Sequence, residues 1–165
     1  MKLVLWCAAA AILAGCAVPV QQKTYDPLPF NAAEYEALPK TGTGVVRGQV
    51  FLKTRGGDVK KGAGAQVILS PATSLSEQSY AEGYKSGKTP RASPGGGETQ
   101  KYWRRATADA DGRFEIRDVP PGKFFVMSEL TWEAPTQFGL AKQGGIIIVP
   151  VLVENGKTSD AMVTK

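Results

Sequence analysis

Residues that could carry out nucleophilic or metal chemistry are scarce in this chain. Its 165 residues include two cysteines, Cys7 and Cys16, and no histidine. The lack of imidazole excludes histidine-based catalytic triads, histidine zinc sites and the usual general base at neutral pH. The chain also has no Ser-x-x-Lys pair. We therefore expect no enzyme activity, no cofactor and no metal site; an enzyme would need an exposed cleft that pairs lysine with serine, or two carboxylates.

Two short motifs imitate ligand-binding loops but lack essential parts. The stretch from Gly83 to Thr89 has three residues between its glycines where a phosphate-binding loop needs four, and Pro90 follows where a helix should begin. The stretch from Asp109 to Gly112 resembles the start of a calcium loop, but the remaining ligands of an EF-hand are missing. We reject the first as a nucleotide site and predict that the second forms a turn.

The N-terminus predicts export and lipidation. Lys2 precedes an apolar run from Leu3 to Leu13 that is too short to span a bilayer, which favours a signal peptide over a buried helix. Leu13-Ala14-Gly15-Cys16 resembles the lipobox of bacterial lipoproteins. That resemblance implies cleavage before Cys16, a diacylglyceryl thioether on its sulfur and a further acyl chain, such as palmitate, on its amine. Two or three chains anchor a protein stably in a membrane.

The same resemblance implies a cellular address. Ala17 follows the cysteine where an aspartate would retain a lipoprotein at the inner membrane, so we expect the cell envelope, at the outer membrane, on either the periplasmic face or the surface. Cys7 would be removed and Cys16 lipidated, leaving no thiol for a disulfide or a nucleophile. The net charge of +5 fits either attraction to anionic envelope surfaces or a scattered, solvated surface. It is too weak to predict nucleic-acid binding.

Residues 16–42 read as the lipidated cysteine and a flexible tether. Four prolines and a polar run favour extended, weakly ordered backbone. Within this segment, Asn31 could cap a short helix over residues 32–38, with Glu34 completing a capping box. We expect this tether to space one domain from the bilayer.

From Thr43 onward the hydrophobic period is two. Val46, Gly48, Val50 and Leu52 share one face of a predicted strand, which indicates one buried side. Turn residues separate the short apolar runs, and Asn155-Gly156 predicts a tight hairpin. Further strands are expected at 66–69, 102–108, 113–119, 123–130, 145–149, 151–154 and 158–163. This spacing predicts an all-β fold, a single antiparallel immunoglobulin-like or prealbumin-like sandwich of about seven strands.

One motif resembles a known family. The sequence from Thr107 to Ile116, running into Val119-Pro120-Pro121-Gly122-Lys123-Phe124, resembles the carboxypeptidase regulatory-like domain, a small prealbumin-like sandwich. Gly48-Gln49-Val50 and the stretch from Gly62 to Leu69 resemble its first two strands. The resemblance covers 43–165 and implies a fold rather than an activity, because such modules serve accessory, adhesive, carbohydrate-associated and transport roles.

Aromatic residues in and after a long loop are the candidate binding residues. Residues 73–101 exceed an ordinary strand connection, and long loops are often functional or disordered. Tyrosine and tryptophan beside arginine suit stacking, cation-π contacts and hydrogen bonding, although the same residues could simply pack the fold. The candidates are Tyr80, Tyr84, Tyr102, Trp103, Arg104 and Trp132.

Two functions remain open. The leading hypothesis is a non-catalytic, lipid-anchored envelope protein that acts as an accessory or protein-interaction module. The alternative is a carbohydrate-binding module for peptidoglycan or surface polysaccharide, with the loop aromatics as stacking platforms.

Overall fold

A computed structural model describes residues 22–165, so the predicted signal peptide (1–15) and the lipidation site at Cys16 lie outside the described residues. The strands are β1 (Thr24–Tyr25), β2 (Gly44–Lys53), β3 (Val59–Lys61), β4 (Gln66–Pro71), β5 (Thr89–Pro90), β6 (Arg104–Thr107), β7 (Arg113–Val119), β8 (Gly122–Thr136), β9 (Gly139–Val153) and β10 (Thr158–Val163). The helices are α1 (Ala32–Glu36), α2 (Ser74–Gln78), the π-helical η1 (Ser79–Lys85) and the 3-10 helical η2 (Pro94–Tyr102).

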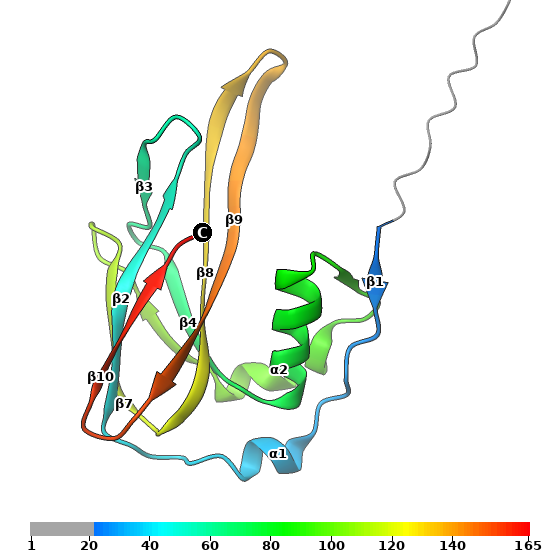
Figure 1. The fold of residues 1–165 in the computed structure, drawn as a ribbon, viewed down its shortest axis with the longest axis vertical. Coiled ribbons are helices and arrows are strands. Elements are labelled where there is room, and N and C mark those ends of the chain that lie inside the picture. Colours follow the sequence, from blue (N-terminus) through cyan, green and yellow to red (C-terminus); the bar gives the residue numbers. More distant parts are fainter. Residues whose placement is uncertain (1–21) are drawn as a thin grey trace, which may run out of the picture.

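Two four-stranded sheets form the body of the protein (Figure 1). In the first sheet, β2 pairs with β10 on one side and with β3 and β7 on the other. In the second sheet the order is β6-β4-β8-β9. The predicted all-β sandwich is therefore confirmed.

The core lies between the sheets and follows the predicted alternation. On β2, Val46 and Val50 are fully buried and Leu52 nearly so, while Arg47 and Lys53 are exposed. On β8, Phe124 and Val126 pack into the same core. Each strand stays in register because a slip of one residue would turn its apolar side chains to water.

The Asp109–Gly112 stretch forms the predicted turn. The Asp109 carboxylate accepts hydrogen bonds from the backbone N–H groups of Asp111 and Arg113, both at 2.8 Å. Gly112 has a φ of 79°, a conformation that favours glycine. The Asp111 carboxylate instead pairs with Lys61 and Arg113, which lowers the pKa of Asp111, first through the hydrogen bond from Lys61.

The sandwich is not wholly antiparallel, and one predicted hairpin is wrong. β10 pairs with β2 in parallel. The turn at Asn155-Gly156 carries the chain from β9 in the second sheet to β10 in the first, so it does not close a hairpin. The Asn155 side chain instead accepts a hydrogen bond from the backbone N–H of Thr43, and the Gly156 N–H donates to the Thr43 hydroxyl. Turn chemistry alone could not reveal this change of sheet.

A long hairpin extends one end of the second sheet. The strands predicted at 145–149 and 151–154 are one continuous strand, β9, which pairs with β8 along its whole length (Figure 1). Gly122 lies opposite Val153 at one end of this pairing, and Thr136 lies opposite Gly139 at the other. Near its tip, Phe138 is 91% exposed and Leu140 is 69% exposed. We call residues 130–145 the hairpin arm.

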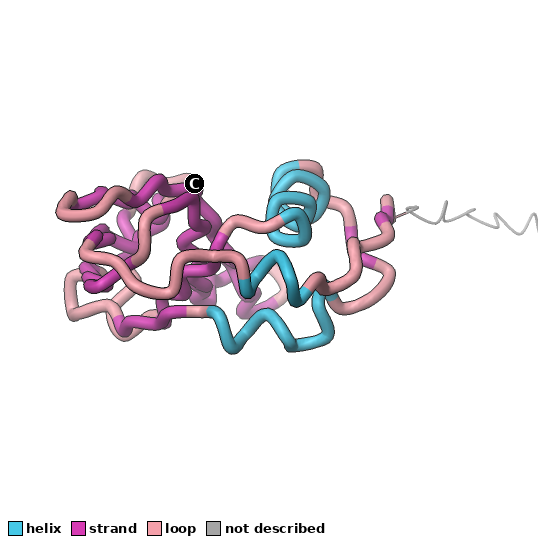
Figure 2. The backbone as a smooth tube through the Cα atoms, turned by 90° about the horizontal axis from the view of Figure 1, so that it is seen from below, coloured by secondary structure: helices cyan, strands magenta, loops and turns pink. Residues whose placement is uncertain are grey.

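The helices lie together beside the strands rather than among them (Figure 2). The 73–101 loop is ordered and folds as α2, η1, β5 and η2 on the outer face of the second sheet. The ring of Tyr80 in η1 lies 4.9 Å from that of Phe125 on β8, so η1 packs on the sheet through this pair. None of the helices in residues 22–165 combines the length and the apolar character that crossing a membrane requires.

The flexible tether predicted for 16–42 is wrong over residues 24–40. β1 pairs in parallel with β5, and the Asp26 carboxylate forms an ion pair with Arg91 at 2.7 Å. Tyr35 in α1 is only 1% exposed. These segments are far apart in sequence, so composition could not indicate that a proline-rich stretch would find partners in the loop.

Candidate functional site

Tyr35 organises the region where the N-terminal segment meets the loop. Its ring centroid lies 5.0 Å from that of Phe30 and 4.6 Å from that of Tyr102. The hydroxyl of Thr73 donates to the Tyr35 phenol oxygen at 3.0 Å. Burial is the largest influence on Tyr35 and raises its pKa, so the phenol stays neutral at physiological pH.

The capping pattern differs from the predicted one. α1 is present, but the Asn31 side chain does not cap it. Glu34 accepts hydrogen bonds from the Ser74 backbone N–H at 2.7 Å and from the Ser74 hydroxyl at 3.0 Å. Thr73 and Ser76 form the capping box of α2. Glu34 thus places α1 against the first turn of α2.

A second contact ties η2 to α1. The Tyr102 hydroxyl donates to the Glu36 carboxylate at 2.7 Å. This hydrogen bond lowers the pKa of Glu36 and, as its largest cause, raises the pKa of Tyr102. The ring of Tyr102 is therefore held in one orientation, with a neutral hydroxyl and an ionised carboxylate at its edge.

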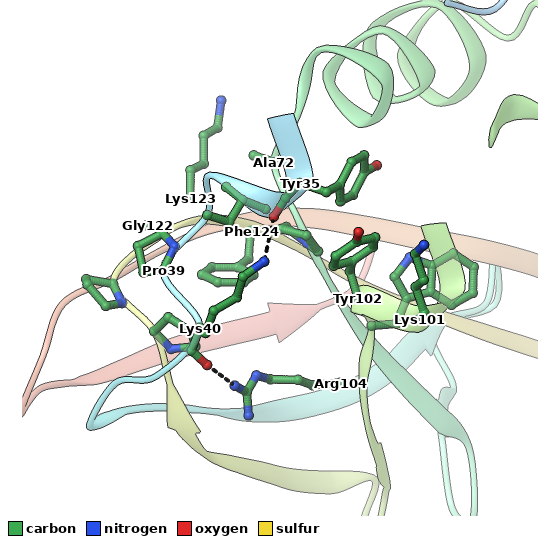
Figure 3. Close-up of a pocket in the computed structure, with 15 residues that line it drawn as sticks. Tyr35, Pro39, Lys40, Ala72, Lys101, Tyr102, Arg104, Gly122, Lys123 and Phe124 are labelled. Carbon is green, nitrogen blue, oxygen red and sulfur yellow. Dashed lines mark hydrogen bonds between the residues drawn. The ribbon is translucent and has the colours of Figure 1, made fainter. Parts of the chain in front are cut away.

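A cavity, which we call the basic cavity, lies where these segments meet the start of β8 (Figure 3). It has a volume of about 310 Å³. Its wall combines aromatic rings, prolines and four cationic residues, and no lining residue is acidic; the cations are Lys40, Lys101, Arg104 and Lys123. The Lys40 ammonium donates to the Tyr35 carbonyl at 3.1 Å, and the Arg104 guanidinium reaches the Lys40 carbonyl at 3.5 Å.

A second, apolar cavity of about 240 Å³ lies between the helices and the outer face of the second sheet. Tyr80, Phe125, Met127 and Ile148 are among its lining residues. Tyr35 and Trp103 line both cavities.

Trp103 carries an unusual donor. Its indole Nε1 is buried and has no hydrogen-bond partner among residues 22–165. A buried donor left unpaired costs about 1–3 kcal/mol, so this group lowers the stability of the fold locally. The guanidinium of Arg105 lies 5.4 Å from the Trp103 ring, in a cation-π contact.

The structure brings together only some of the predicted site residues. Tyr102, Trp103 and Arg104 line the basic cavity, and Tyr80 lines the apolar one. Tyr84 stacks on Tyr80 at 5.7 Å without lining either cavity.

Trp132 belongs to a different part of the molecule. It packs against the edge of the core from the hairpin arm. It lies eight positions along β8 from Phe124 at the basic cavity, which corresponds to about 26 Å along a strand. Trp132 therefore lies away from the two cavities lined by the loop aromatics, and its role as a candidate binding residue stays a prediction.

Several site residues were not predicted. Tyr35 and Lys40 come from the supposed tether, Lys101 from the loop, and Lys123 from the start of β8. The sequence signal was the presence of three aromatic residues, Tyr25, Phe30 and Tyr35, in a proline-rich segment.

A solved structure is similar over most of the chain. It is a crystal structure of a protein from Pseudomonas aeruginosa described as a "putative carbohydrate binding protein", 31% identical in sequence, with a TM-score of 0.73. The alignment covers 85% of this chain and 100% of the other. This chain belongs to the same family as the Pseudomonas protein.

That relationship supports the β-rich sandwich and goes no further on its own. No family model matches the chain, and no curated protein matches it either. The resemblance to the carboxypeptidase regulatory-like domain and the lipoprotein assignment thus stay predictions.

Proposed function

We propose that this protein is a non-catalytic, lipid-anchored protein of the cell envelope that binds glycans in the basic cavity. The observation that carries the proposal is the placement of Tyr102, Trp103 and Arg104 in one cavity wall. A carbohydrate site needs an aromatic face beside polar groups that hydrogen-bond hydroxyls. The cavity provides both, and its volume lies at the lower end of the range for small-ligand pockets. The description of the Pseudomonas protein supports the same function.

Binding to isolated peptidoglycan sacculi and to a glycan array tests the proposal. We expect the full-length chain in detergent to bind at least one glycan, and Tyr102→Ala to weaken that binding about tenfold, since aromatic contacts contribute roughly 1 kcal/mol or more beyond area burial. Tyr84→Ala is the matched control because Tyr84 is half-buried and lies outside both cavities. The proposal fails if no glycan binds, or if both variants weaken binding equally.

Membrane attachment requires its own test. The lipobox motivates Cys16→Ser, which we expect to move the protein from the membrane fraction to the soluble fraction and to leave the precursor unprocessed. Normal processing and continued attachment of this variant would contradict the anchor.

The hairpin arm favours a second function, as a protein-interaction module. Phe138 and Leu140 are exposed near its tip, and exposed apolar groups that gather at one place often mark interaction surfaces. Crosslinking in whole cells should capture an envelope protein with the natural chain and much less of it with Phe138→Ser. Equal capture by both chains would remove the arm from consideration.

A further inference from the structure

The basic cavity carries a charge pattern that narrows the class of glycan. Four of its lining residues are cationic and none is acidic. Three of the four pair with a carboxylate that is not part of the lining: Lys40 pairs with Glu36, Lys101 with Glu98, and Lys123 with Glu77.

Arg104 differs from the three lysines. Among residues 22–165 it forms no ion pair, and its single hydrogen bond, to the Lys40 carbonyl, is long at 3.5 Å. A guanidinium has five N–H donors in a planar fork that matches a carboxylate through two parallel hydrogen bonds. Most of this capacity is unused, although the side chain is half-buried in the cavity wall.

We propose that the basic cavity selects acidic glycans, and that Arg104 binds the carboxylate of a uronic acid residue. The inference rests on the proposed function and concerns the same site. A uronic acid residue presents one carboxylate beside a sugar ring, which suits a lone guanidinium next to Tyr102 and Trp103.

Calorimetric titration with two probes tests the selectivity. Oligogalacturonate and its fully methyl-esterified form share one backbone and differ in charge. We expect the full-length chain in detergent to bind the acid at least tenfold more tightly than the ester, because hydrogen bonds to charged groups contribute about twice as much as neutral ones. Raising the salt concentration should weaken binding of the acid and leave that of the ester nearly unchanged.

Two variants locate the effect. Arg104→Gln should remove most of the preference for the acid, and Arg104→Lys should restore little of it because the fork is lost. Arg47→Gln is the control, since Arg47 is exposed on the outer face of the first sheet and pairs there with Asp160. If Arg104→Gln does not fold, Arg104→Lys tests the role of the guanidinium, and the salt dependence of the natural chain tests the preference for the acid.

The outcomes separate the two proposals. Equal binding of acid and ester overturns the selectivity and leaves glycan binding intact. Tighter binding of a phosphorylated oligomannoside than of oligogalacturonate overturns the choice of carboxylate. Failure of all three probes, together with the glycan array, overturns the proposed function and the inference with it.

Discussion

The outer faces of the two sheets differ in chemistry. On the first sheet, Arg47 lies in register between Glu115 on β7 and Asp160 on β10, and the exposed surface is charged. On the second sheet, Phe125 is only 2% exposed because η1 covers it, and Met127 and Ile148 face the apolar cavity. A charged face remains in water without cost, whereas an apolar one must be covered. The basic cavity and the apolar cavity lie where the covering segments meet the second sheet.

The largest expected effect concerns burial on the two faces. Phe125→Ala should lower the free energy of unfolding by about 3 kcal/mol or more, because it removes a buried ring and its contact with Tyr80. Met162→Ala on the first sheet, where Met162 is 54% exposed, should change it by less than about 0.5 kcal/mol. Urea unfolding measures both values. Similar losses would mean that the two outer faces are equivalent in energy.

A smaller effect concerns the polar contact at the centre of the covering segments. Tyr35→Phe removes the oxygen that accepts from the buried Thr73 hydroxyl, and should cost about 1 kcal/mol in the same assay. Tyr84→Phe is the control, because the Tyr84 hydroxyl has no hydrogen bond among the interactions found in residues 22–165. If the two variants lose the same stability, the Thr73 contact contributes nothing of its own.

The smallest expected effect is a dependence of stability on pH, which differs between the segments that cover the second sheet and the turn at Asp111 in the first sheet. The pKa of Glu36 is lowered, first by the hydrogen bond from Tyr102, so its contribution is present above the usual carboxyl pKa and is lost as pH falls through the lowered one. The pKa of Tyr102 is raised, first by the bond to Glu36, so its contribution is lost as pH rises through the raised value. In the turn before β7 of the first sheet, the pKa of Asp111 is lowered by Lys61, so the contribution of this pair is lost only as pH falls.

Titration of tyrosine ring carbons by NMR measures this difference. We expect Glu36→Gln to move the pKa of Tyr102 down toward its ordinary value, since the interaction that raises it most is removed. Glu77→Gln, which removes the partner of Lys123, should leave it unchanged because neither group influences Tyr102. An unchanged Tyr102 pKa in Glu36→Gln would show that this hydrogen bond does not hold η2 to α1 in solution.

The regions that could be predicted from sequence are those governed by neighbours along the chain. The strands at 113–119 and 158–163 and the turn at Asp109 match the structure, because alternation and turn chemistry act over a few residues. The continuous β9 and the hairpin arm were missed because Gly144 and Gly145 interrupt the apolar pattern although the strand continues through them.

The candidate site was predicted in part. Tyr102, Trp103 and Arg104 are adjacent in the chain, so their proximity needed no tertiary information. Trp132 was a separate candidate, chosen on residue type alone, which says nothing of distance in space. Tyr35 and Lys40 were missed because a proline-rich stretch is ordinarily a spacer.

By itself, the sequence determined the all-β class, the lack of histidine chemistry and the faces of the core strands, because residue types and a period of two are local properties. Only the tertiary structure decided that the N-terminal segment is part of the site. The Tyr102–Glu36 hydrogen bond joins residues 66 positions apart, and such a contact depends on how whole segments pack on the second sheet. The apolar outer face of that sheet must be shielded from water, and the segments that shield it line the basic cavity and the apolar cavity.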